Sequence, residues 1–357
     1  MDNGISLYPG LENTFEENLR LLNVAAENKV KRIFTSFHVP ETNFNEFQNQ
    51  FNQLMKAAAQ NEMEVISDVS PAALALLGAK KLNLSLFRIR GIRRLRLDYG
   101  YDSDVVSELS RNTCGIGLQL NASAVTADFL SELEQKGADF SRMDALHNFY
   151  PRPGTGLSEG FFKEQTKLFQ KKGIKVGAFV PSFAGPRLPL RKGLPTMEEH
   201  RRLSLELAAR HLCALGADSV FIGDGRPSDQ EIKTVAFLQK DTVILKVKAE
   251  VQNTQIKNLL QGVFTARLDE ARDAVRAQEG RDVFRDVSVE AENTSGRSFG
   301  TVTLDNNNYL RYKGEVQLIK NPQPADEKVN VVGKIIPEEL FMLKYITPGK
   351  KFSLEFI

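Results

Sequence analysis

The stretch KRIFTSFHVPETNFNEFQNQFNQLMKAAAQNEMEVISDVS, residues 31–70, contains one complete strand–helix–strand pattern. Its two ends, KRIFTSF (31–37) and EVISDVS (64–70), are short runs rich in β-branched and apolar residues, which is typical of buried strands. Between them, FNEFQNQFNQLMKAAAQ (44–60) has apolar residues at helical spacing and predicts an amphipathic helix. Two strands joined through a helix predict a parallel pair, because parallel neighbours need a crossover connection.

The same pattern repeats in both directions along the chain. GISLYP (4–9) predicts a strand before it, followed by a helix over 14–29 that Thr14 and Glu17 begin with capping-box spacing. Further strands are predicted near 94–98, 115–121, 141–149, 175–181 and 218–225, and further helices near 71–78, 102–111, 126–137, 158–172, 197–215 and 228–239. Thr196 and Glu199 have the spacing of a second capping box, at the start of the helix over 197–215.

Eight strand–helix units predict a (β/α)8 barrel of the TIM type. The alternative is a doubly wound open sheet, which usually carries GxGxxG after its first strand, and YPGLENT (8–14) is not that motif. After residue 240 the strands no longer alternate with helices: β-rich runs follow at 242–251, 298–305, 309–319, 329–336 and 351–357, and only 265–279 predicts a helix. We therefore expect a barrel domain over 1–240 and a small β-barrel or sandwich over 241–357.

Composition excludes several classes of protein. Of 357 residues, 41% are hydrophobic and 26% charged, with 47 Lys and Arg against 45 Asp and Glu, so the overall charge favours neither nucleic acid nor a membrane as partner. The two cysteines, Cys114 and Cys213, form no disulfide framework, and MDNGISLYPG at the N-terminus lacks the features of a signal peptide. We expect a cytoplasmic protein without a membrane span.

Polar residues end most of the predicted strands. In a TIM-type barrel the reacting groups lie at the carboxyl ends of the strands, so these residues are the candidates for the active site. Four are carboxylates: Glu41, Asp68, Asp98 and Asp224. The others are Tyr8, His38, Asn121, His147, Asn148 and Tyr150. An aspartate at the end of a strand can also cap the next helix, and that interpretation stays open for each of the three.

The loops after the seventh and eighth strands are rich in basic residues. PSFAGPRLPLRKGLPTMEEHR (181–201) and GDGRP (223–227) contain Arg187, Arg191, Lys192 and Arg226. Barrels of this type often bind phosphate at this place, and a guanidinium group can hold phosphate oxygens in a bidentate manner. A solvated basic loop without a ligand is the alternative.

The residue types at the strand ends limit the chemistry. No lysine lies there, which disfavours a Schiff-base aldolase. The four histidines form neither HxH nor HExxH, and His200 and His211 are expected to lie too far apart on one helix to share a metal, so we predict no metal and no cofactor. Carboxylates remain, and the reaction typical of a carboxylate pair is glycoside cleavage, for which Asp98 and Asp224 are the first candidates, followed by Asp68 and Glu41.

Several short motifs resemble one bacterial family along nearly the whole chain. They are GISLYPG (4–10), FTSFHVPE (34–41), SDVSP (67–71), RLRLDYG (94–100), HNFYPRPGTGLS (147–158), GLPTMEEHR (193–201), FIGDG (221–225) and RYKGEVQLI (311–319). Their order and spacing are similar to those of the 6-phospho-N-acetylmuramidases. The resemblance implies a TIM-type barrel with a cyclophilin-like β domain. It also implies that the substrate is N-acetylmuramic acid 6-phosphate linked β-1,4 to N-acetylglucosamine, cleaved during peptidoglycan recycling.

Such a substrate bears a phosphate, a carboxylate and N-acetyl groups, which gives the loop HNFYPRPGTGLS (147–158) an expected role. Arg152, between two prolines, is predicted to bind an anionic group, Thr155 lies beside it, and Tyr150 and Phe149 either pack against a sugar face or belong to the core. The C-terminal domain is expected either to cover the cleft, with Arg297, Asn306 or Arg311 reaching the substrate, or to form dimer contacts. A phosphosugar isomerase or epimerase and a non-catalytic sugar-binding protein remain the alternatives.

Overall fold

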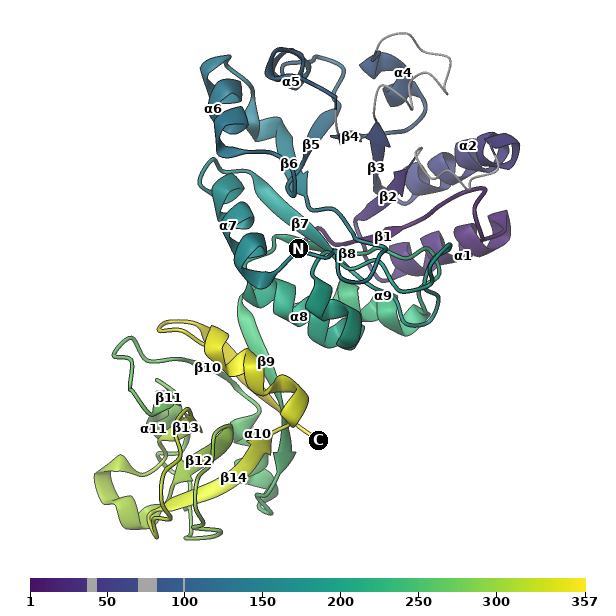
Figure 1. Ribbon diagram of the computed structural model, residues 1–357. Coiled ribbons are helices and arrows are strands. Elements are labelled where there is room, and N and C mark those ends of the chain that lie inside the picture. The colour runs from purple at the N-terminus through teal and green to yellow at the C-terminus, as the bar shows by residue number, and fades with distance from the viewer. Residues whose placement is uncertain (37–43, 70–81, 99) are drawn as a thin grey trace. The chain divides into compact units, whose positions relative to one another are not determined.

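A computed structural model describes residues 1–36, 44–69, 82–98 and 100–357 of the chain. The chain forms two compact units, Met1–Leu238 and Gln239–Ile357. Figure 1 shows the first unit in purple to green and the second in green to yellow. No helix of the described residues is long and apolar enough to cross a membrane.

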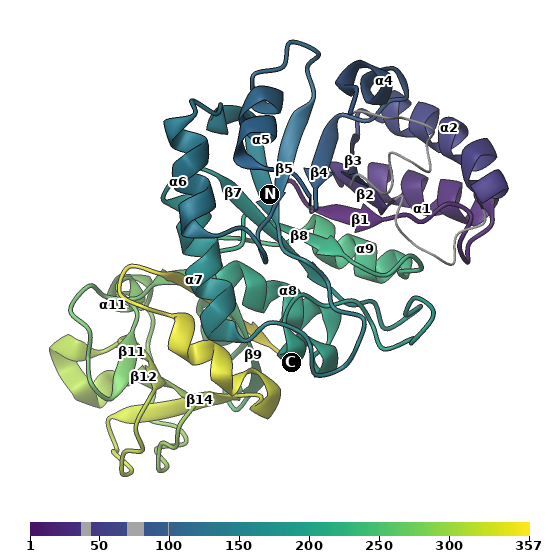
Figure 2. The same cartoon turned by 45° about the horizontal axis from the view of Figure 1, so that its top comes forward.

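The first unit is a closed barrel of eight parallel strands, as the repeated strand–helix pattern predicts (Figures 1 and 2). Neighbouring strands follow one another in sequence, and the eighth pairs with the first. The strands are β1 (Gly4–Ser6), β2 (Arg32–Ser36), β3 (Glu64–Val69), β4 (Arg94–Leu97), β5 (Gly117–Asn121), β6 (Met143–Leu146), β7 (Lys175–Val180) and β8 (Ser219–Ile222).

Helices lie outside these strands (Figure 2). They are α1 (Phe15–Glu27), α2 (Phe44–Gln60), α4 (Leu84–Ile89), α5 (Ser103–Ser110), α6 (Ala127–Gln135), α7 (Glu159–Gln170), α8 (Leu205–Ala214) and α9 (Asp229–Ala236), with the short 3-10 helices η1 (Phe140–Arg142) and η2 (Glu198–Arg202). The sequence did not indicate α4, and the helix predicted near 71–78 lies outside the described residues.

The hydrogen bonds at the first residues of the helices show which of the predicted capping boxes form. The capping box of Thr14 and Glu17 is confirmed, and Ser228 and Glu231 form another at the start of α9. The predicted helix over 197–215 is wrong in its first half, because η2 ends at Arg202 and α8 begins only after Ser204, whose side chain caps it. The Thr196 hydroxyl instead donates to Asn148 O (2.8 Å) and accepts from Phe179 N (2.9 Å), so it joins two strand ends.

Large apolar side chains fill the middle of the barrel. Tyr8, Phe34, Ile66, Leu146, Phe179 and Phe221 form one buried cluster. Full burial of a side chain of this size contributes about 1.5–3 kcal/mol, so the barrel interior is a packed core and ligands reach only its ends. The candidate site is therefore sought in the loops at the carboxyl ends of the strands.

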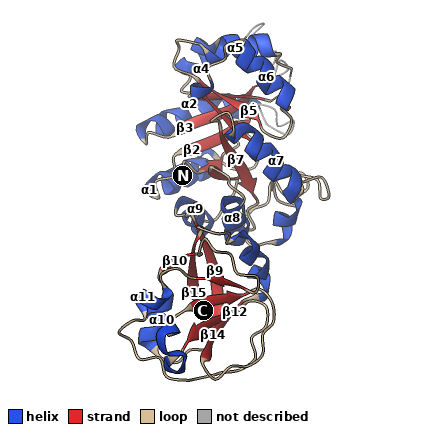
Figure 3. Ribbon diagram, turned by 90° about the vertical axis from the view of Figure 1, so that its left-hand side faces the viewer, coloured by secondary structure: helices blue, strands red, loops and turns tan. Residues whose placement is uncertain are grey.

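The second unit is a curled, seven-stranded mixed sheet (Figure 3). In sheet order its strands are β10 (Val263–Thr265), β15 (Lys351–Phe356), β9 (Thr242–Ala249), β14 (Val329–Ile335), β12 (Thr301–Asp305), β13 (Val316–Ile319) and β11 (Ala274–Arg276). Only β9 and β15 pair in parallel, and one bridge between Ala266 and Ala277 joins the two edges. Four helices, α10 (Thr254–Leu260), α11 (Gly280–Val283), η3 (Asn307–Tyr312) and η4 (Pro337–Tyr345), connect these strands.

Two predictions for this unit are wrong. The run 265–279 is not a helix but contains the end of β10 and all of β11, and the strand predicted over 309–319 begins only at Val316, after η3. Both errors come from short segments whose partners are distant in sequence, since β10 pairs with β15 and β11 with β13. Pairing with a distant strand overrides local helical propensity.

Candidate active site

Alternation along β4 carries polar side chains into the barrel. In RLRLD (94–98), Leu95 and Leu97 lie on one face of the strand, and Arg94, Arg96 and Asp98 lie on the other. Arg96 contacts residues of the neighbouring strand β3 and of the segment after β6, so its face of β4 is the barrel interior. Arg94 then lies near the amino end of the strands, and Asp98 at the carboxyl end.

Arg96 is the centre of a charged network at the carboxyl ends of the strands. Its Nη1 donates to Asp68 Oδ1 (2.8 Å) and Asp98 Oδ1 (2.9 Å), and its Nη2 donates to Asn148 Oδ1 (2.5 Å). Burial alone lowers the pKa of Arg96, but the two carboxylates raise it, and the net pKa lies above the ordinary value. The guanidinium is therefore a permanent positive charge, only 3% exposed, between two acids.

Asparagine side chains hold Asp98 in place. Asn121 Nδ2 donates to Asp98 Oδ1 (2.9 Å), while Asn121 Oδ1 accepts from Ser123 N (3.0 Å). Asp98 Oδ1 thus accepts two hydrogen bonds, whereas Oδ2 has no partner in the part of the chain that the structure describes. Because the Asp98 side chain is 27% exposed, this second oxygen is available to a ligand. Asp68, Asp98, Asn121 and Asn148, all predicted site residues, therefore lie together.

Aromatic residues form the other side of the barrel mouth. Tyr8 donates its hydroxyl to Gly223 O (2.7 Å), and burial raises its pKa to about 12. The ring of Phe149 packs edge-on against Phe34 and Phe179, with ring centroids 6.2 and 5.1 Å away. The guanidinium of Arg187 lies over the rings of both Tyr8 (4.6 Å) and Phe149 (5.1 Å). Phe149 therefore joins the core and also supports a cation.

Asp224 organises a loop, and its geometry does not suit the expected catalytic role. Its side chain is fully buried, and its oxygens accept backbone hydrogen bonds from Ser182 (2.8 Å), Arg187 (2.8 Å) and Leu194 (3.1 Å). Burial raises the pKa of Asp224 to about 6, although the three backbone donors act in the opposite direction. Both oxygens are occupied, so Asp224 shapes the loop after β7 instead of facing a substrate.

The loop HNFYPRPGTGLS (147–158) binds another loop of the same chain. Tyr150 N donates to Pro195 O (2.9 Å), and Leu157 pairs with the segment 196–198 through two backbone hydrogen bonds. Glu198 accepts from Gly156 N (2.9 Å), and a Cβ on Gly156 would lie 2.6 Å from Glu198 N, so glycine is required there. This loop is therefore built mainly to fix the segment 193–201.

An arginine that the sequence did not point to completes this loop pair. Arg201 donates to Tyr150 O (2.8 Å), to Gly193 O (3.1 Å) and to both oxygens of Glu198 (2.8 and 3.0 Å). Hydrogen bonding from Arg201 lowers the pKa of Glu198 to about 2. Arg152, expected to bind an anion, is exposed and outside this network, and the Thr155 hydroxyl donates to the Arg152 carbonyl (2.7 Å).

The other predicted phosphate-binding arginines lie apart from Arg187. Arg191 pairs with Glu12 (3.1 Å) and Arg226 with Glu17 (3.6 Å), and their side chains are 57% and 48% exposed. Both line a cavity of about 390 Å³ together with Arg20 and the segment 184–186. The structure thus divides the three predicted arginines between the barrel mouth and this outer cavity.

The three histidines that the structure describes lie in the protein interior. His147 is fully buried, with its ring nitrogens near Ser123 Oγ (3.1 Å) and Thr166 Oγ1 (3.3 Å), and burial lowers its pKa to about 3. Its neighbours in sequence, Leu146 and Asn148, face the interior, so His147 points outward and cannot bind substrate as predicted. His200 and His211, expected to be far apart, are hydrogen-bonded to each other at 3.0 Å, because they come from η2 and α8.

Two predicted site residues, His38 and Glu41, lie outside the described residues, so their roles stay predictions. Among the residues that the structure does describe, no group of three or more His, Cys, Asp or Glu side chains could hold a metal ion.

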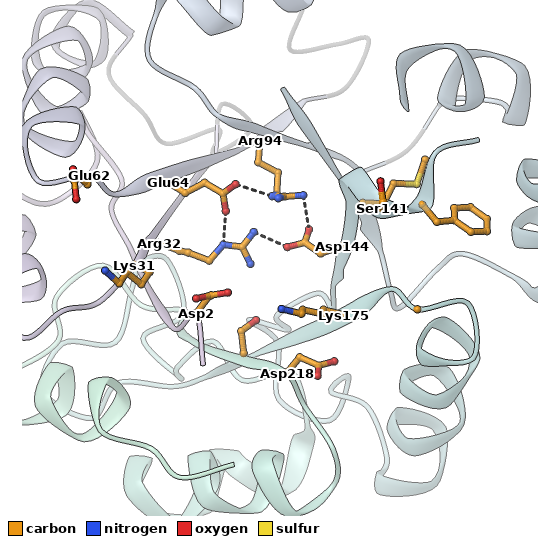
Figure 4. Close-up of a pocket in the computed structure, with 14 residues that line it drawn as sticks. Asp2, Lys31, Arg32, Glu62, Glu64, Arg94, Ser141, Asp144, Lys175 and Asp218 are labelled. Atoms are coloured by element: carbon orange, nitrogen blue, oxygen red, sulfur yellow. Dashed lines mark hydrogen bonds and ion pairs between the residues drawn. The ribbon is translucent and has the colours of Figure 1, made fainter. Parts of the chain in front are cut away.

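A larger cavity, of about 410 Å³, lies at the amino ends of the strands (Figure 4). Arg32 pairs there with Glu64 (2.6 Å) and Asp144 (2.5 Å), and Arg94 contacts the same two acids (3.0 and 3.4 Å). These charges neutralise one another. The amino end of such a barrel contributes to stability, whereas the chemistry takes place at the carboxyl end. We therefore place the active site at the mouth that contains Arg96 and Arg187.

Fold and site together define a class: a (β/α)8-barrel enzyme with paired carboxylates at the carboxyl ends of its strands, the arrangement of a glycosidase. Two family models, described as the N-terminal and C-terminal parts of 6-phospho-N-acetylmuramidase, match residues 3–237 and 243–355. The chain belongs to the 6-phospho-N-acetylmuramidase family, and it is an enzyme of the glycosidase class.

Two solved structures are similar to this chain along nearly its whole length. A crystal structure of an uncharacterized B. cereus protein is 33% identical, with a TM-score of 0.87, and the match covers 99% of this chain and 98% of that one. A conserved Enterococcus faecalis protein of unknown function is 34% identical, with a TM-score of 0.72 and coverage of 99% and 96%. No curated protein matches.

Proposed function

We propose that the chain hydrolyses the β-1,4 bond between N-acetylmuramic acid 6-phosphate and N-acetylglucosamine in the recycling of cell-wall fragments. The observation that supports this most strongly is the carboxylate pair Asp68 and Asp98, which share one guanidinium nitrogen of Arg96 at the barrel mouth. Glycoside cleavage needs one carboxyl group to protonate the leaving oxygen and a second to act at the anomeric carbon. The family name supplies the substrate class.

The spacing of the pair favours retention of configuration. The two bonded oxygens are separated by less than about 6 Å, because both lie within one hydrogen-bond length of the same nitrogen. Retaining glycosidases have carboxyl groups roughly 5–5.5 Å apart, whereas inverting ones need about 6.5–9.5 Å to admit a water molecule. We therefore expect a covalent glycosyl-enzyme intermediate.

Within the pair, Asp98 is assigned to the anomeric carbon. Its Oδ1 accepts from Arg96 and Asn121, which fix the carboxylate in place, and its side chain is partly exposed and can reach a substrate. The group that protonates the leaving oxygen is either Asp68 or Glu41, the two carboxylates that follow Asp98 and Asp224 among the catalytic candidates predicted from the sequence. Asn121 and Asn148 orient the carboxylate and the guanidinium.

The test compares Asp98→Asn, Asp68→Asn and Glu41→Gln on the natural disaccharide and on a 6-phosphorylated aryl glycoside with a good leaving group. The variant that lacks the acid should keep turnover of the aryl glycoside. The variant that lacks the nucleophile should lose both activities, and azide should restore turnover of the aryl glycoside. Proton NMR of the first sugar released should show the β-anomer. An α-anomer would refute the retaining mechanism, and normal turnover by Asp98→Asn would remove Asp98 from the site.

Further expectations are part of this proposal. The resemblance implies a cyclophilin-like type for the C-terminal sheet, the two cysteines and the N-terminal sequence predict a cytoplasmic location, and a homodimer is a separate expectation, whose mass light scattering would measure. In the C-terminal unit, Arg297 donates to Pro324 O, Asn306 donates to Asn330 Oδ1 and Arg311 donates to the Tyr312 hydroxyl. Of these, Arg311 is exposed and is the residue to test for substrate contact.

A further inference from the structure

Arg187 is a buried cation held between two fixed aromatic rings. The residue is 9% exposed, and its guanidinium carbon lies 4.6 Å from the centre of the Tyr8 ring and 5.1 Å from that of Phe149. Neither ring is free to move, because the Tyr8 hydroxyl is bonded to Gly223 O and Phe149 packs against Phe34 and Phe179. The two rings therefore fix the position of the guanidinium carbon before any ligand binds.

The side-chain N–H groups of Arg187 have no acceptor in the part of the chain that the structure describes. Among the described residues none accepts a hydrogen bond from the Arg187 side chain, and Nε and Nη1 are both shielded from solvent. Asp224, which accepts from the Arg187 backbone, uses both of its oxygens for backbone hydrogen bonds. A buried charge without hydrogen bonds is costly, so such a group is expected where a ligand supplies the acceptors.

Two carboxylates hold the backbone amides of Arg187 and of the residue that follows it. Asp224 accepts from Arg187 N (2.8 Å), and Glu12, which is 9% exposed, accepts from Leu188 N (2.9 Å) and pairs with Arg191. The loop after β7 is thus anchored to the segments after β1 and β8. Asp224 and Glu12 are positioning residues, since they hold the loop that carries the cation.

We propose that Arg187 is the receptor for an oxyanion of the substrate and makes the barrel mouth selective for anionic sugars. The inference rests on the proposed function and adds the residue that recognises the charge. Two groups of that substrate share the required chemistry, the 6-phosphate and the carboxylate of the lactyl ether. Arg191, Arg226 and Arg152 are not part of this receptor, because they are exposed and the first two already pair with carboxylates.

The first experiment measures kcat/KM of the wild type, Arg187→Met and Arg187→Lys, with Arg191→Met and Arg226→Met as matched controls. Three substrates are compared: the phosphorylated disaccharide, the same sugar without phosphate, and the phosphorylated sugar without the lactyl group. A lost charge-assisted contact corresponds to roughly a 10- to 150-fold change. Arg187→Met should lose that factor through KM, and its discrimination against the substrate that lacks the recognised group should vanish. Arg187→Lys keeps the positive charge and should retain part of the substrate affinity and of the discrimination.

The outcomes separate this inference from the proposed function. The inference is overturned if Arg187→Met still prefers the substrate with the recognised anionic group as strongly as the wild type does. It is also overturned if Arg191→Met or Arg226→Met loses that preference instead. In both cases the glycosidase assignment stands. If the wild type cleaves none of the three sugars, the proposed function fails, and a second measurement still tests Arg187. Inorganic phosphate should then raise the melting temperature of the wild type, Arg191→Met and Arg226→Met but not of Arg187→Met, and an equal rise in all four would refute the receptor.

Discussion

Replacing Arg96 by methionine tests whether one buried cation holds the candidate active site together. The change keeps the length of the side chain but removes its contacts with Asp68, Asp98 and Asn148. Breaking a buried ion pair by removing one partner destabilises a protein by about 3–5 kcal/mol. We expect Arg96→Met to lose that amount of unfolding free energy at pH 7.5, together with measurable turnover.

The pH dependence distinguishes a lost charge from a lost packing contact. Without Arg96, two carboxylates less than about 6 Å apart repel each other by roughly 3 kcal/mol at an effective dielectric constant of about 20. That repulsion equals about two units on the pH scale, so one of them should take up a proton near pH 6. The folded variant then binds more protons than its unfolded chain between about pH 6 and pH 4, and acidification stabilises it.

Urea unfolding at pH 7.5 and pH 5.0 measures the effect. The chain has no tryptophan, so circular dichroism of the helices, most of which belong to the barrel unit, is the suitable signal. Relative to the wild type, the deficit of Arg96→Met should shrink by about 1–2 kcal/mol at the lower pH. An equal deficit at both pH values would refute the reasoning. Arg94→Met, two residues away on β4, removes contacts with Glu64 and Asp144 at the other end of the barrel, and should lose stability but keep turnover.

Three further predictions follow from other groups. Because burial lowers the pKa of His147 to about 3, the wild type should lose about 2 kcal/mol more unfolding free energy than His147→Gln between pH 6.5 and pH 5, as urea titrations of both would measure. Glu198→Gln weakens the bonds to Arg201 and Gly156 that hold the segment 193–201, so trypsin should cut after the exposed Lys192 faster than in the wild type, and an unchanged rate would contradict the loop pairing. Burial and the nearby Glu315 raise the pKa of Asp305 to about 7, which destabilises the folded state increasingly as the pH rises from about 4 to 7. Asp305→Asn should therefore gain about 1–3 kcal/mol more at pH 8 than at pH 5, and a gain independent of pH would exclude this cause.

The alternation of side chains along the strands explains which site residues could have been predicted from the sequence. Arg96 lies two residues before Asp98, so strand alternation puts both on one face, and this signal was present in RLRLD (94–98). The same rule separates Asn148 from His147, which follow each other and therefore point to opposite sides. A list of polar residues at strand ends ignores this alternation, and that is why it included His147 and omitted Arg96.

Other errors had no local signal. The sequence FIGDG (221–225) does not indicate that both carboxylate oxygens of Asp224 accept hydrogen bonds from backbone amides of the loop after β7. The sequence 197–215 predicts one continuous helix. In the structure, Arg201 and the loop after β6 hold the segment 193–201, and the helical turn there ends at Arg202. In both cases the decisive contacts join residues from different strand–helix units.

The sequence by itself determined the barrel, its division from the β-rich second unit, and the set of strand ends from which the site is built. These follow from periodicity and order along the chain, because hydrophobic alternation and strand–helix repetition are local properties. Only the tertiary structure decided which polar groups face one another: Arg96 between Asp68 and Asp98, Asp224 inside a loop, and Arg187 between two aromatic rings. Those choices depend on burial and on hydrogen bonds between segments distant in sequence, which exist only once the barrel has closed.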